Sequence, residues 1–93
     1  MGRYFVDLTD NAKEDMRFWR KVGDESVFKK IKKLFLELSE HPTTGTGRPE
    51  LLNGNFAGYW SRRINRHHRI IYEINDGVVT VLVLSLRGHF GDS

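Results

Sequence analysis

The stretch from Val78 to Leu86 carries apolar side chains on both of its alternating faces, and this pattern limits the folds open to the chain more than any other. A strand that is apolar on both faces lies inside a sheet and is covered on both sides. The sequence therefore predicts that this strand is central and that other segments of the chain cover it. One face holds Val79, Val81 and Val83, and the other holds Val78, Leu82, Leu84 and Leu86.

Two amphipathic helices are predicted before this strand, and they can supply one of its covers. Thr9 and Asp10 offer caps for a helix that ends at Gly23, and Asp24 or Ser26 can cap a second helix that ends before Pro42. Because Gly23 and Asp24 leave almost no linker, we expect an antiparallel helical hairpin. The apolar stripes are Ala12, Met16 and Trp19, widened by Phe18 and Val22, and Val27, Ile31, Leu34 and Leu38, widened by Phe28 and Phe35.

Three further strands are predicted, at Tyr4–Val6, Tyr59–Ile64 and Arg69–Ile74. The last three strands of the chain are separated by short turns, and short connections favour antiparallel pairing. The expected fold is therefore α+β, with the element order β-α-α-β-β-β and a mostly antiparallel, twisted sheet covered on one face by the helical hairpin. A chain of 93 residues can build one hydrophobic core, so we expect a single domain over residues 1–93.

The composition excludes several kinds of chemistry. Cysteine is absent, which removes disulfides, thiolate metal sites and a cysteine nucleophile. The longest apolar run, Val78 to Leu84, is too short to cross a membrane, and the N-terminus lacks the apolar core of a signal peptide. We therefore expect a cytoplasmic protein with no membrane partner. The net charge of +3 permits a nucleic acid or an acidic protein as a partner and selects neither.

Most of the reactive side chains lie between Gly47 and Arg69. Arginine matches phosphate oxygens, aromatic rings stack on bases, and an acid near histidines can move protons. The same composition also describes an ordinary solvated hairpin, so by itself it does not decide for a site. The residues concerned are Glu50, Tyr59, Trp60, Arg62, Arg63, Arg66, His67, His68 and Arg69.

Each face of the predicted strand 59–64 receives one aromatic residue and one arginine, so at least one arginine is expected to contact other parts of the fold. Arg69 begins the next strand, and either a substrate anion or an internal salt bridge to Glu73 or Asp76 would satisfy its charge. The basic residues of the second helix are open to two interpretations as well, a solvated face or a surface for an acidic partner. They are Lys29, Lys30, Lys32 and Lys33.

The four histidines do not have a spacing known for metal sites, and we predict no metal. Among them, His89 follows the central strand and could exchange a proton at neutral pH. The Gly45-Thr46-Gly47 segment is too short a signal for a nucleotide-binding loop. The histidines are His41, His67, His68 and His89.

The segment GRPELLNGNFAGYWSRRINRHHRIIYEI resembles the signature region of the YoeB/Txe toxins, which belong to the RelE superfamily of bacterial toxin–antitoxin proteins. The match consists of Gly45 to Glu50, then Gly58 to Ile64, then His68 to Tyr72. Weaker similarity extends over almost the whole chain. The resemblance implies a RelE-like fold, with the same order of elements that the residue patterns predict.

The resemblance implies a toxin of a type II toxin–antitoxin system: a ribosome-dependent, metal-independent endoribonuclease that cuts messenger RNA by 2′-hydroxyl attack and so inhibits translation. It implies a cognate antitoxin, the ribosome and messenger RNA as partners, self-association into a homodimer, and no cofactor. The family's catalytic glutamate, arginine and terminal histidine correspond to Glu50, Arg69 and His89. Arg63 corresponds to an arginine that holds RNA, and Arg48 replaces a basic residue of the same loop.

These residues suit metal-free cleavage of RNA. Glu50 would act as the base, His89 as the acid and Arg69 as the stabiliser of charge, with Arg48 and Arg63 on flanking phosphates and Phe90 stacked on a base. Glutamate is a weak base at neutral pH, so this interpretation expects the loop to bury Glu50 partly and strengthen it.

The chain departs from the family pattern at three places. Phe90 replaces a tyrosine and keeps the stacking face without the hydroxyl, Asn53 replaces a common lysine, and residues 91–93 extend the tail. Reduced activity is therefore one expectation. The alternatives are a ParE-like toxin that inhibits DNA gyrase without being an enzyme, and an RNA-binding module whose catalysis has decayed.

Overall fold

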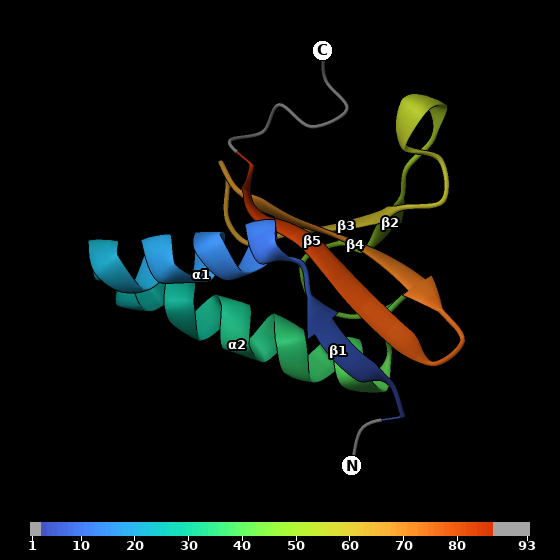
Figure 1. Ribbon diagram of the computed structural model, residues 1–93, viewed down its shortest axis with the longest axis horizontal. Coiled ribbons are helices and arrows are strands. Elements are labelled where there is room, and N and C mark those ends of the chain that lie inside the picture. The colour runs from blue at the N-terminus through green and yellow to red at the C-terminus, as the bar shows by residue number, and fades with distance from the viewer. Residues whose placement is uncertain (1–2, 87–93) are drawn as a thin grey trace.

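The computed structural model describes the backbone of residues 3–86 and the side chains of residues 3–82. Figure 1 shows two layers, a pair of helices and a twisted sheet. The helices are α1 (Asp10–Val22) and α2 (Glu25–Glu40), and the strands are β1 (Phe5–Leu8), β2 (Glu50–Leu51), β3 (Trp60–Arg63), β4 (Arg69–Asn75) and β5 (Val78–Leu86).

Both helices begin where the sequence provides a side-chain cap. The hydroxyl of Thr9 accepts a hydrogen bond from the backbone N–H of Ala12 at 3.1 Å, and the carboxylate of Asp24 accepts one from Val27 at 3.2 Å. Gly23 ends α1 in the left-handed conformation, with φ of 76°, and turns the chain directly into α2. The predicted antiparallel hairpin of helices is therefore confirmed (Figure 1).

The sheet has the strand order β1-β5-β4-β3-β2. β1 runs parallel to β5, and the other neighbouring strands are antiparallel. This confirms the α+β class and the mostly antiparallel sheet, and β5 lies inside the sheet as expected. Two elements were not predicted, the two-residue edge strand β2 and a short 3-10 helix, η1 (Gly54–Phe56), between β2 and β3.

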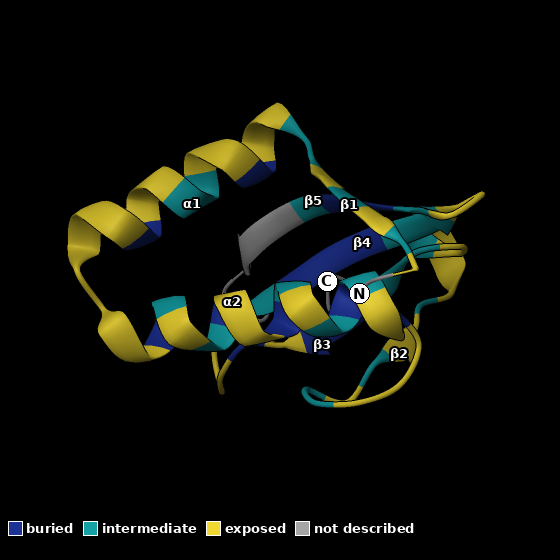
Figure 2. Ribbon diagram, turned by 90° about the horizontal axis from the view of Figure 1, so that it is seen from below, coloured by how far each residue is buried: buried dark blue, intermediate teal, exposed yellow. Residues whose placement is uncertain are grey.

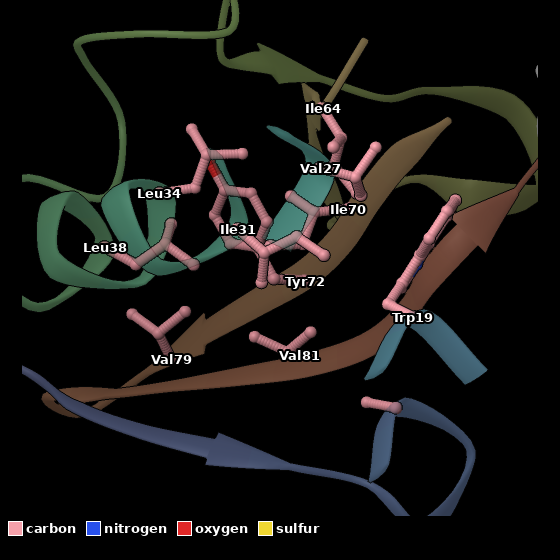
Figure 3. Close-up of a cluster of buried hydrophobic side chains, with 11 residues drawn as sticks. Trp19, Val27, Ile31, Leu34, Leu38, Ile64, Ile70, Tyr72, Val79 and Val81 are labelled. Atoms are coloured by element: carbon pink, nitrogen blue, oxygen red, sulfur yellow. The ribbon is translucent and has the colours of Figure 1, made fainter. Parts of the chain in front are cut away.

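One face of the sheet, which we call the inner face, packs against the helices and forms the hydrophobic core with them (Figures 2 and 3). Figure 3 shows side chains of α2 pointing toward those of β4 and β5. The predicted inward stripe of α2 is fully buried, and Ala12 and Trp19 of α1 are buried with it. The buried residues of this core are Ala12, Trp19, Val27, Ile31, Leu34, Leu38, Ile64, Ile70, Tyr72, Val79 and Val81.

Two packing predictions are wrong. Phe18 and Val22, expected to widen the stripe of α1, are 43% and 54% exposed, because the buried stripe of this helix is narrow and consists of Ala12 and Trp19. The second face of β5 is covered only in part, since Val78 and Leu82 are half-buried whereas Val79 and Val81 are fully buried. We call this second side of the sheet, away from the helices, the outer face.

Candidate active site

Strand register brings three of the predicted site residues to the outer face. In an antiparallel pair, residues directly opposite each other project from the same side of the sheet. Glu50 of β2 is opposite Ser61 of β3, and Arg63 of β3 is opposite Arg69 of β4. Because Ser61 and Arg63 are two residues apart on one strand, Glu50, Arg63 and Arg69 all share the outer face.

Next to this face is a hollow of about 330 Å³, lined by Arg48, Pro49, Glu50 and Arg63, which we call the basic hollow. Glu50, Arg48 and Arg63 are exposed, and Arg69 is half-buried. Arg48 has a φ of 54°, a left-handed conformation that glycine adopts at lower cost. Arg48 therefore places a cationic side chain at a backbone position that favours glycine.

Among the side chains of residues 3–82 and the backbone of residues 3–86, no hydrogen bond or ion pair engages the side chains of Glu50, Arg63 or Arg69. The internal salt bridge considered for Arg69, to Glu73 or Asp76, is therefore not formed in this part of the chain. Like charges directly across two strands destabilise a sheet. The opposed pair Arg63 and Arg69 is thus unfavourable by itself, and a bound anion would relieve it.

This repulsion predicts an unusual effect of Arg63→Gln. We expect the substitution to raise the free energy of unfolding by about 0.5 kcal/mol at low salt, because it removes one of two opposed cations. The gain should shrink in high salt, which screens exposed charges. Urea unfolding at two salt concentrations measures both effects, with Arg66→Gln, an exposed arginine in the β3–β4 turn, as the matched control. A loss of stability at low salt would contradict the cross-strand repulsion.

The expected partial burial of Glu50 is wrong, because both residues of β2 are exposed at the edge of the sheet. The carboxylate therefore meets solvent, and the desolvation that strengthens a base would have to come from substrate covering the hollow. His89 and Phe90, the predicted acid and stacking residue, lie outside the described residues, as does the rest of the tail. Asn53 is exposed immediately before η1.

Arg62 is the arginine that contacts the fold, and the sequence did not distinguish it from its neighbours. Its side chain is fully buried on the inner face and makes five hydrogen bonds. It also forms an ion pair with Glu37 of α2 at 2.8 Å. Strand alternation predicted that such an arginine exists, but its partner lies 25 residues earlier and on another element.

Glu37 is held in its charged form. Partial burial alone would raise its pKa, but hydrogen bonds from the hydroxyl and backbone N–H of Thr46 and from Arg62 outweigh that effect, so the pKa lies below its ordinary value. Tyr72 completes this buried group by donating from its hydroxyl to the carbonyl of Pro42 at 2.6 Å. Burial raises the pKa of Tyr72, and Arg62 partly opposes the rise.

The lowered pKa of Glu37 predicts a pH dependence of stability. A group whose pKa is lower in the folded state stabilises the protein above its unfolded pKa, about 4.5 here, and that contribution is lost as the pH falls through the folded-state value. We expect urea unfolding of the wild type to show this loss below pH 4.5 and Glu37→Gln to show a shallower slope there. Glu40→Gln, an exposed glutamate at the end of the same helix, is the control. Equal slopes in all three proteins would contradict the assignment.

Across residues 3–86, no group of three or more histidine, aspartate or glutamate side chains is placed to hold a metal ion. Within the same residues, neither helix has the length and apolar character needed to cross a bilayer.

Comparison with known proteins assigns the family. A family model described as YoeB-like toxin of bacterial type II toxin-antitoxin system matches residues 8–90. Toxin YoeB of Mycobacterium bovis is 40% identical over 77 residues, which is 83% of this chain and 89% of that protein. The fold, the family model and this relative thus define a toxin of a bacterial type II toxin–antitoxin system. Within that class, the chain belongs to the YoeB-like family.

Solved structures agree with the assignment. A YoeB/ParE toxin from Agrobacterium tumefaciens superposes with a TM-score of 0.83 at 32% identity, covering 88% of this chain and 96% of that one. A heterotetrameric YoeB-YefM toxin-antitoxin complex from Staphylococcus aureus gives a TM-score of 0.79 at 31% identity, covering 89% and 95%. The RelE-like fold expected from the sequence is therefore confirmed.

Proposed function

We propose that this toxin is a ribosome-dependent endoribonuclease that cuts messenger RNA and so inhibits translation, and that it needs no metal ion. The observation that carries the proposal is the grouping of Glu50 with Arg48 and Arg63 in one solvent-facing hollow, next to Arg69 on the same face. A lone carboxylate among unpaired cations suits a polyanionic substrate that also has a proton to give up.

The reaction can be assigned to these side chains. Glu50 removes the proton of a ribose 2′-hydroxyl, and that oxygen attacks the adjacent phosphorus. The bond from phosphorus to the 5′-oxygen breaks, leaving a 2′,3′-cyclic phosphate and a 5′-hydroxyl, whose proton comes from His89. Arg69 stabilises the charge on the phosphorane, and Arg48 and Arg63 hold flanking phosphates. Phe90 stacks on a base.

The partners follow from the same charges. Relatives from Staphylococcus aureus are known as a YoeB dimer and as YoeB-YefM complexes. For this chain we infer a cognate antitoxin whose acidic segment neutralises the arginines of the outer face, and a homodimer. Because the proposed substrate is messenger RNA on the ribosome, we infer that the protein acts in the cytoplasm, with the ribosome and messenger RNA as further partners.

Primer extension on a defined messenger RNA tests the proposal. Cuts within codons are expected when the purified toxin is added to a translation mixture, and far fewer when ribosomes are left out. A DNA gyrase supercoiling assay run in parallel detects the ParE-like alternative. Absence of cuts together with gyrase inhibition would overturn the nuclease in favour of that alternative, and absence of both effects would favour a decayed RNA-binding module.

A further inference from the structure

The guanidinium of Arg62 is bonded mostly to one loop, residues 41–47, which joins α2 to the basic hollow. One terminal nitrogen donates to the carbonyls of His41 at 2.7 Å and Thr44 at 2.6 Å. The other donates to the carbonyl of Thr46 at 3.2 Å and to Glu37 at 2.8 Å, and the Nε donates to the hydroxyl of Tyr72 at 3.3 Å. Three backbone carbonyls of the loop therefore share a single buried side chain.

Two glycines let the loop pass close enough for these bonds. A Cβ added at Gly45 would lie 2.5 Å from the carboxylate of Glu37. At Gly47 it would lie 2.7 Å from the carbonyl of Arg63, whose N–H donates to the carbonyl of Gly47 at 2.7 Å. Both glycines also have positive φ values, 112° and 86°. The loop is thus fixed against α2 at one end and against β3 at the other.

The residue after this fixed loop is Arg48, and Glu50 follows two residues later. Within residues 3–86, neither side chain has a hydrogen bond or ion pair of its own. Their location depends on the backbone that leads into them, and on the pairing of Glu50 with Ser61. Arg62 lies between Ser61 and Arg63 on β3, so one strand carries both the buried anchor and the exposed cation of the hollow.

We propose that Arg62 is a positioning residue: by binding the carbonyls of residues 41–47 from the inner face, it holds Arg48 and Glu50 beside Arg63 on the outer face. It touches no substrate. Arginine is required because it offers five N–H donors in a rigid, planar fork, whereas lysine offers three donors from one point. For catalysis the inference rests on the proposed nuclease function, but the order of the loop can be measured without it.

The test separates positioning from folding by using the double variant Arg62→Met with Glu37→Leu. Replacing a buried ion pair by apolar residues of similar volume often restores stability. The double variant should therefore recover much of the melting temperature lost in Arg62→Met alone, yet its three loop carbonyls still lack their donor. Because Glu37→Leu also removes the acceptor of two hydrogen bonds from Thr46, Glu37→Leu alone is measured beside it, and the loop should be more mobile in the double variant than in that single variant. We expect messenger RNA cleavage at least about tenfold below wild type. Heteronuclear NOE values of the Gly47 and Glu50 amides should also fall to those of a mobile loop.

Two comparisons keep the outcome decisive. Arg62→Lys keeps the charge, and at a temperature where its circular dichroism is native it should show the same loop mobility and reduced cleavage, even if the double variant does not fold. Arg17→Met removes an exposed arginine from α1 and should change neither readout.

The inference is overturned if a folded Arg62 variant keeps rigid loop amides or cuts as fast as wild type. If the wild type itself cuts nothing, the proposed nuclease function fails, and the NOE values alone decide the role of Arg62.

Discussion

Glu50→Gln is expected to lower the rate of messenger RNA cleavage by about a hundredfold or more, because it removes the proposed base while keeping nearly the same shape. Stability should change by less than about 0.5 kcal/mol, since the side chain is exposed. RNA binding should be unchanged or tighter, because the change removes a negative charge from a hollow lined by Arg48 and Arg63. Single-turnover cleavage on programmed ribosomes, urea unfolding and a binding titration measure the three quantities.

Glu14→Gln is the matched control for this experiment, as it removes one exposed glutamate from the helical layer instead of the outer face. It should leave cleavage, stability and binding unchanged. If Glu50→Gln cuts RNA at the wild-type rate, the assignment of the base is wrong. If it cuts slowly only because RNA binding is lost, Glu50 has a role in binding instead.

Arg62→Met is expected to reduce the free energy of unfolding by about 3 to 5 kcal/mol, the largest stability effect that we predict. It leaves the Glu37 carboxylate without its cation and removes the donors of five hydrogen bonds, one of them buried and four partly buried. That loss is a large fraction of the roughly 5 to 15 kcal/mol by which such a domain is stable.

Urea unfolding measures this loss, with Arg3→Met as the control that removes the same charge from an exposed position. The control should change stability by less than about 0.5 kcal/mol. A cost below about 1 kcal/mol for Arg62→Met would mean that water replaces its bonds easily, and the buried cluster would then have little weight in folding.

Much of the fold could be predicted because the deciding signals are local. Caps at Thr9 and Asp24, the turn at Gly23 and the apolar stripe of α2 are each readable within a few residues, and all are found. The edge strand β2 was missed because two residues carry no periodicity, and it forms only by pairing with β3. Exposure of Phe18 depends on how the helix lies on the sheet, which its own sequence does not state.

The candidate site, too, could be predicted only in part from the sequence. Glu50, Arg63 and Arg69 were named from a motif, and the register of three strands brings them to one face. What the motif could not distinguish is which arginine faces the interior. Arg62 and Arg63 are adjacent and chemically identical, yet one is fully buried and the other is exposed. The difference follows from strand alternation once the inner face is known.

The sheet separates its two kinds of residue by face, and this has an evolutionary consequence. Residues that fold the protein lie mostly on the inner face, whereas Glu50, Arg63 and Arg69 project from the other. Substitutions among the latter cost little stability, so selection can alter the chemistry of the outer face without rebuilding the core. The YafQ structure has this fold at 14% identity, so the same scaffold can form from a very different sequence.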